Sequence, residues 1–269
     1  MKKAILILSI LISCTLWLNG QVTTSAPICL KAPTTRGISE LPAASVSLTD
    51  LKAVLIVGPC ESSTEGFINE MKEYAEVLKE RGVTCYEFYS PDNSWDDIKK
   101  AAEGAHFLLY GGHGIYNGTR PPDWVGSFCL NSGFVRSEKV LSDLKLAKGA
   151  IVMFNHACFS AGAAGGDHGD IGSSEAKRRV NLYSKPFLSL GISAYYSSGW
   201  YNSLSEIIAA LFAGDTFGEA YKDYCIYNEE STIRSKHPDN TGLDVWISSG
   251  YNYTFVGNSS KTLSEIFGN

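Results

Sequence analysis

The chain has 269 residues, of which 44% are hydrophobic, so it is long enough and apolar enough to bury a substantial core. It carries 23 basic and 28 acidic residues, a formal charge of -5, and no run of Lys and Arg is long enough for a broad phosphate-binding face, which argues against nucleic acid as a partner. The 26 glycines follow no period, which excludes collagen-like and low-complexity classes.

The first twenty residues have the composition of an export signal. Lys2 and Lys3 precede an apolar run over residues 4–18, and a polar break follows at residues 19–21. The run is shorter than the roughly 20 residues that a membrane-spanning helix needs, and no later segment comes near that length. We therefore predict that residues 1–20 are a signal peptide, that no membrane span follows, and that the protein is exported to the periplasm, the cell surface or the medium.

A lipid anchor is the alternative to cleavage after Gly20. Residues 11–14 (LISC) resemble a bacterial lipobox, in which Cys14 would carry the lipid, although the apolar residues 16–18 fit a cleaved signal better. Residues 21–50 hold three prolines and many Ser and Thr, which is typical of an N-terminal extension or linker. We predict one domain over residues 51–269.

From residue 51 onward, short apolar runs alternate with stretches of helical period, which is typical of an α/β domain with a mostly parallel sheet covered by helices. Strands are predicted at residues 53–57, 83–89, 106–110, 150–154 and 192–197, with one or two more in 245–256. Helices are predicted at residues 67–81, 95–103, 137–144 and 204–224, the last interrupted by Gly214 and Gly218. We also expect a hairpin around residues 131–133 and a flexible, glycine-rich loop over residues 160–170.

Two of the predicted strands end in residues that can carry chemistry. The third leads into His113 and Gly114, and the fourth, which is entirely apolar and therefore predicted to be central, leads into Ala157 and Cys158. The carboxyl ends of parallel strands meet at one edge of a sheet, so we expect these residues to face one crevice. A thiolate is a strong nucleophile, and the N-terminus of a following helix would favour the thiolate form of Cys158. An imidazole can protonate a departing amine. The backbone N–H groups of Gly114 and Cys158 are predicted to form an oxyanion hole.

These segments resemble the caspase-like cysteine peptidases of clan CD, which include caspases, legumains, clostripains and gingipains. Residues 107–114 (FLLYGGHG) and 151–158 (IVMFNHAC) match the two halves of the pattern in order and separation. Weaker similarity at residues 211–220 and 253–259 points to gingipain-like and clostripain-like bacterial members. The resemblance implies a caspase-like three-layer sandwich that hydrolyses peptide bonds of a protein or peptide substrate. It also implies a Cys158 acyl-enzyme, His113 as acid and base, and no cofactor.

The substrate-binding residues are expected at the same edge. Caspases recognise aspartate with arginines, one of them on the strand that corresponds to residues 194–202, but no arginine is present there. Aspartate preference is therefore not expected, although Ser198, Gly199 and Trp200 are predicted to line the cleft. His156, two residues before the nucleophile, is predicted either to line the specificity pocket or to orient a neighbour.

The loop after Cys158 suggests a preference and a processing site. Asp167 and Asp170 favour a basic substrate residue, and the basic run at residues 177–179 would then be a candidate site of self-processing. A cation site at Asp167, His168 and Asp170 is a weaker interpretation, because these residues lack a recognised ligand spacing.

Other interpretations of the chain remain open. The six cysteines beyond residue 20 show no CxxC pattern, so no metal cluster and no dense disulfide framework are predicted. Cysteines other than Cys158 are expected to be small buried residues. The alternatives to a peptidase are a catalytically inactive caspase-like binding module and a thiol amidase on the same fold.

Overall fold

The structure is a computed structural model that describes residues 48, 50–116, 127–199, 204–225 and 227–268. The predicted signal peptide at residues 1–20, the alternative lipid anchor at Cys14, nearly all of the predicted extension at residues 21–50, and Trp200 lie outside the described residues.

A central sheet organises the described residues, and its eight strands follow the order β2-β1-β3-β6-β7-β10-β9-β8. The first five in this order run parallel: β2 (Thr84–Tyr89), β1 (Lys52–Val57), β3 (Phe107–Gly111), β6 (Ile151–Asn155) and β7 (Ala194–Ser198). The other three pair antiparallel: β10 (Tyr253–Gly257), β9 (Asn240–Ile247) and β8 (Ile233–His237). A separate hairpin joins β4 (Ser127–Leu130) to β5 (Gly133–Arg136). The predicted α/β class with a mostly parallel sheet is confirmed.

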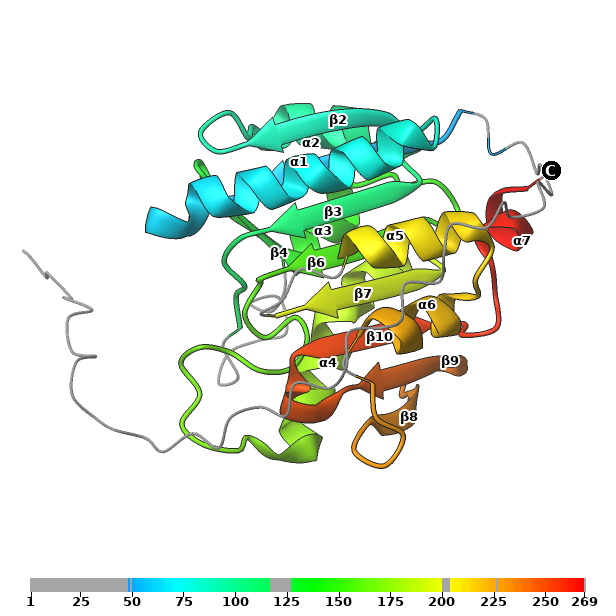
Figure 1. Ribbon diagram of the computed structural model, residues 1–269. Coiled ribbons are helices and arrows are strands. Elements are labelled where there is room, and N and C mark those ends of the chain that lie inside the picture. Colours follow the sequence, from blue (N-terminus) through cyan, green and yellow to red (C-terminus); the bar gives the residue numbers. More distant parts are fainter. Residues whose placement is uncertain (1–47, 49, 117–126, 200–203, 226, 269) are drawn as a thin grey trace, which may run out of the picture. The chain divides into compact units, whose positions relative to one another are not determined.

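Helices cover both faces of the sheet. One face carries α1 (Thr64–Glu80), α5 (Leu204–Ala213), α6 (Phe217–Tyr224) and the short α7 (Leu263–Phe267). The other face carries α2 (Trp95–Ala102), α3 (Ser137–Asp143) and α4 (Gly172–Ser189). Figure 1 shows α1, α5 and α6 in front of the sheet, with α2, α3 and α4 behind it. Within the described ranges, no helix combines the length and the apolar character needed to cross a bilayer.

Continuous apolar sequence explains the central strands. Every residue of β3, β6, β7 and β10 is buried, because these strands contact helices or loops on both faces. This pattern is typical of parallel sheets and differs from the alternation of a half-exposed strand. By contrast, β2 lies at the edge of the sheet and exposes several of its residues. The run predicted to be central is β6, which lies between β3 and β7.

Three of the described α-helices and β-strands were not predicted, namely α4, β8 and α7. The largest is α4, whose buried residues Ala176, Val180, Tyr183 and Phe187 recur at helical spacing, although Pro186 lies inside the helix. The predicted helix over residues 204–224 is two helices. Gly214 adopts a positive φ of 101°, and Thr216 then begins α6 with a capping box to Glu219.

Phe154 of β6 tests how firmly the central strand depends on its core. Its side chain is fully buried and packs against five aromatic rings, those of Tyr110, Phe128, Tyr183, Phe187 and Tyr195. Phe154→Ala is expected to lower the free energy of unfolding by about 3–5 kcal/mol in urea titrations. The matched control is Phe134→Ala on β5, where the side chain is 59% exposed and the change should stay within about 0.5 kcal/mol. Equal losses in the two variants would contradict this assignment of the core.

Candidate active site

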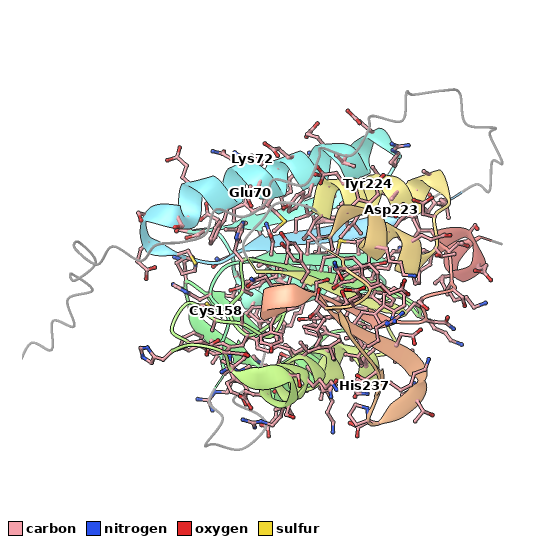
Figure 2. All side chains as sticks on the ribbon, turned by 60° about the horizontal axis from the view of Figure 1, so that its bottom comes forward. Glu70, Lys72, Cys158, Asp223, Tyr224 and His237 are labelled. Atoms are coloured by element: carbon pink, nitrogen blue, oxygen red, sulfur yellow. The ribbon has the colours of Figure 1, made fainter. Side chains whose placement is uncertain are left out.

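The carboxyl ends of β3 and β6 lie side by side, because the two strands are neighbours in the sheet (Figure 1). Their parallel register pairs Gly111 with Asn155 at the last position of each strand. The residues that follow therefore leave the sheet at the same level. This pairing brings His113 and Cys158 to one edge, although they are 45 positions apart in the chain. Figure 2 shows Cys158 below α1, with His237 of β8 well away from it.

Gly114 makes the closest approach between the two segments. A Cβ atom built on Gly114 would lie 1.8 Å from the carbonyl oxygen of Cys158 and 2.7 Å from its backbone nitrogen. Contacts this short are not possible for a real side chain, so only glycine fits here without displacing the Cys158 backbone. The residue type at position 114 thus allows the loop after β3 to pack directly on the residue that carries the thiol.

His113 is held by a carboxylate that the sequence analysis missed. Its Nε2 lies 3.0 Å from Oε2 of Glu61, which begins a short 3-10 turn at Glu61–Ser63 just beyond β1. The side chains of His113 and Glu61 are 46% and 81% exposed, so solvent weakens their attraction. The sequence does contain a signal for Glu61, because this residue follows a predicted strand and so lies at the same edge of the sheet as His113 and Cys158. Three adjacent strands, β1, β3 and β6, thus supply Glu61, His113 and Cys158.

A buried tyrosine fixes the backbone of the histidine loop. Oη of Tyr110 donates a hydrogen bond to the carbonyl oxygen of His113 at 2.9 Å and accepts one from the N–H of Cys129 at 2.9 Å. The loop is therefore tied to the β4–β5 hairpin. Among the described residues, no hydrogen bond joins the His113 ring to the Cys158 thiol, so the two segments meet through the backbone at Gly114.

The thiol lies on a turn and not at the start of a helix. Cys158 is partly exposed between Ala157, which is buried, and Phe159, whose φ is 70°. The N–H of Ser160 bonds the carbonyl oxygen of Ala157, which closes the turn, whereas α4 begins only at Gly172. The expectation that a helix N-terminus favours the Cys158 thiolate is therefore wrong. The glycine-rich sequence after the thiol favours turns over helix, which is the physical reason.

His156 faces α1 at the edge of the sheet. Its backbone adopts a φ of 58°, which is unusual for a residue with a side chain, and its N–H donates to the carbonyl oxygen of Ser198. Its ring stacks on Phe67 with the centroids 4.5 Å apart, and Nε2 lies 2.7 Å from Oε2 of Glu70. Asn155 donates to the same carboxylate oxygen at 2.8 Å. These contacts hold the His156 ring against α1.

The other predicted cleft residues lie at the end of β7. Ser198 is 1% exposed, so its side chain does not line a surface, while its carbonyl oxygen holds His156. Gly199 is partly exposed, and its N–H donates to the carbonyl oxygen of Asn252 at 2.7 Å. Of Ser198 and Gly199, only Gly199 is partly exposed at the surface. Trp200 lies outside the described residues.

The predicted loop at residues 160–170 is hydrogen-bonded to α4. Arg179 of α4 is 7% exposed, and its guanidinium makes two hydrogen bonds to Asp167, at 2.8 and 2.9 Å, and one to the carbonyl oxygen of Gly162. These hydrogen bonds from Arg179 lower the pKa of Asp167. The pairing is favourable because an arginine fork matches a carboxylate in geometry and charge.

The predicted self-processing site belongs to the same network. Residues 177–179 lie inside α4, and Arg179 is buried and paired. Peptidases bind substrate segments in extended form, so cleavage here would require α4 to unfold. Asp167 is likewise engaged by Arg179 and is not free to attract a basic substrate residue.

Comparison with known proteins identifies no family, since neither a family model nor a curated protein matches this chain. Among the described residues, no group of three or more His, Cys, Asp or Glu side chains is arranged to hold a metal ion.

A comparison of Cys158 with the neighbouring Cys60 tests which of the two thiols is reactive. Burial and the neighbouring Glu61 raise the pKa of Cys60 to about 12, so only about one part in ten thousand is thiolate at pH 8. Iodoacetamide is expected to alkylate the partly exposed Cys158 at pH 8 while Cys60 stays unmodified, as read by peptide mass spectrometry. In urea the two should react at similar rates. Equal rates in the folded protein would contradict the described burial.

The carboxylate network around α4 predicts a pH dependence of stability. Burial would raise the pKa of Glu175, but hydrogen bonds from Arg178, Arg179 and Tyr116 outweigh it and lower the pKa to about 2. The stabilisation is therefore complete above the ordinary pKa of 4.5 and is lost as the pH falls toward 2. Glu175→Gln should lower the free energy of unfolding by about 1–3 kcal/mol at pH 7. The difference in this free energy between wild-type protein and the variant should shrink as the pH falls from about 5 to about 3. If the difference between wild-type protein and the variant stays constant over this pH range, the ion network is not its source.

Proposed function

We propose that this protein is a cysteine peptidase with a caspase-like fold, in which Cys158 attacks the peptide bond and His113 transfers protons. The observation that carries the proposal is the packing of Gly114 on the backbone of Cys158, which puts the imidazole segment and the thiol at one edge of the sheet. A mostly parallel sheet between two layers of helices supports the caspase-like three-layer arrangement.

The first step forms an acyl-enzyme. The thiolate of Cys158 adds to the carbonyl carbon of the scissile bond, and the carbonyl oxygen takes the negative charge. The N–H groups of Gly114 and Cys158 are the candidate donors to this oxygen, since neither donates to another described residue. As the C–N bond breaks, the His113 imidazolium gives its proton to the leaving amine.

The second step releases the acid product. Neutral His113 takes a proton from a water molecule, the resulting hydroxide adds to the thioester carbon, and the sulfur of Cys158 leaves as thiolate. The enzyme then holds a thiolate and an imidazolium again, so the cycle is balanced. Throughout the cycle Glu61 accepts a hydrogen bond from Nε2 of His113, which directs the other ring nitrogen away from Glu61. Glu61 is therefore a positioning residue in this scheme.

Three substitutions test the assignment of roles on a fluorogenic peptide library. Cys158→Ala should abolish turnover, and His113→Ala should lower kcat by about 10²- to 10⁴-fold. Glu61→Gln should have a smaller effect, about tenfold, because the Glu61 side chain is mostly exposed to solvent. The matched control is Cys85→Ala on β2, which removes a thiol from another part of the sheet and should leave turnover unchanged.

Three outcomes would contradict the proposal. Turnover that survives Cys158→Ala would place the chemistry elsewhere. A folded wild-type protein that cleaves no peptide in the library would favour an inactive binding module, and hydrolysis restricted to small amides would favour an amidase.

A further inference from the structure

A second thiol lies at the same edge of the sheet as the proposed catalytic residues and takes no part in the proposed mechanism. It belongs to Cys60, which follows β1 and is 7% exposed. Val57, the last residue of β1, pairs with Gly111 of β3, and the N–H of Gly58 donates to the carbonyl oxygen of Gly111 at 2.9 Å. The segment that carries Cys60 therefore leaves the sheet directly beside the segment that carries His113.

The sulfur of Cys60 contacts the histidine loop. It accepts a hydrogen bond from the backbone N–H of His113. The next residue, Glu61, contacts the His113 ring at 3.0 Å. The N–H of Cys60 donates to Oγ1 of Thr64 at 2.7 Å, which ties the turn that carries the thiol to the start of α1. Cys60 is thus held at the residue that the mechanism uses for proton transfer.

A short stretch of the histidine loop connects the surroundings of Cys60 to those of Cys158. His113 contacts the sulfur of Cys60, and Gly114, the next residue, packs on the backbone of Cys158. A disulfide needs Cα atoms about 4.4–6.8 Å apart, so its formation requires the two segments to come together. Gly112 and Gly114 flank His113, and glycine gives this stretch the backbone freedom for such an adjustment. The two thiols are therefore placed to react with each other.

The two thiols differ in the way that an oxidation-sensitive pair requires. Cys158 is partly exposed, so dissolved oxidants reach it. Cys60 is buried, and this burial, together with the charges of Glu61 and of the nearby thiols, raises its pKa to about 12. A thiolate reduces a peroxide far faster than a neutral thiol does, so Cys158 is oxidised first and Cys60 stays reduced.

We infer that Cys60 is the resolving thiol of this site, the group that converts Cys158 into a reversible disulfide after a peroxide has oxidised it. The inference rests on the proposed function for its effect on turnover, because it assigns a redox regulation to the same nucleophile. The disulfide would remove the attacking thiolate and stop acyl-enzyme formation, and a dithiol reductant would restore both thiols. It would also keep Cys158 from further oxidation to a sulfinic acid, which is irreversible.

The oxidation takes place in two balanced steps. The Cys158 thiolate attacks one oxygen of hydrogen peroxide, the O–O bond breaks, and a sulfenic acid forms while the other oxygen leaves as hydroxide, which takes up a proton to become water. The Cys60 sulfur then attacks the sulfenic sulfur, the S–O bond breaks, and the hydroxyl group leaves with the thiol proton as a second water. The two thiols lose two electrons and two protons in total, and the peroxide gains them.

The main test follows the thiols of the full chain by mass spectrometry. Wild-type protein is treated with hydrogen peroxide at pH 7, free thiols are blocked with iodoacetamide, and the digest is analysed without reductant. We expect a peptide pair joined through Cys60 and Cys158, which dithiothreitol separates. In Cys60→Ser, where the serine hydroxyl can still accept the N–H of His113, dimedone should label the Cys158 sulfenic acid about tenfold more than in wild-type protein.

The matched control is Cys85→Ser on β2. Cys85 is a further thiol whose pKa is raised by burial, to about 11, and its sulfur contacts the carbonyl oxygens of Ala75 and Val83. This variant should form the disulfide and resist dimedone as wild-type protein does.

Two results would overturn the inference. One is a disulfide between Cys60 and Cys129 of β4 while Cys158 accumulates as sulfinic acid. The other is equal dimedone labelling of Cys158 in wild-type protein and in Cys60→Ser.

Turnover distinguishes this inference from the proposed function. If reduced wild-type protein cleaves peptides, excess peroxide should abolish turnover and dithiothreitol should restore it. Recovery of Cys60→Ser should be about fivefold lower, because its Cys158 passes on to sulfinic acid. The disulfide in a protein that cleaves no peptide supports the resolving thiol and refutes the peptidase proposal. Turnover in a protein that forms no such disulfide does the opposite.

Discussion

The parallel pairing of β3 with β6 is the constraint on which the rest of the site depends. It aligns Gly111 with Asn155, so that the two following loops start level with each other at one edge of the sheet. The missing side chain of Gly114 then allows the first loop to touch the backbone of Cys158. Both the level start of the two loops and the approach of Gly114 to Cys158 depend on this strand pair, which is buried at every residue. The rigid part of the molecule therefore sets the spacing of the reactive groups.

The surroundings of the thiol are positioned by polar contacts that link the sheet edge to both helical layers. On one face, Glu70 of α1 holds His156, which keeps the segment before Cys158 in an unusual backbone conformation. On the other face, Arg179 of α4 holds the loop that follows Cys158 through Asp167 and Gly162. The thiol thus lies between two anchored segments. This arrangement suits a nucleophile that has to keep its place while a substrate binds.

Much of the architecture could be predicted from sequence, because buried parallel strands are continuous apolar runs with turn residues at their ends. The strand ends at His113 and Cys158 could be placed for the same reason. The helix α4 was missed because its apolar residues, such as Val180, are separated by polar residues and preceded by glycines. The contact of Glu61 with His113 and the partnering of Asp167 by Arg179 depend on tertiary packing between distant segments, which periodicity does not reveal.

The most direct measurement of the central claim is a crosslink between the two strand ends. A His113→Cys variant is treated with a bis-maleimide that has a two-carbon spacer, and peptide mass spectrometry then identifies the joined residues. The account predicts a crosslink from the introduced thiol to Cys158 in the folded protein. The control is a His106→Cys variant, because residue 106 immediately precedes the first residue of β3, at the opposite edge of the sheet. This variant should form no crosslink to Cys158. Failure of the first variant to crosslink, while both of its thiols react singly with maleimide, would contradict the shared edge.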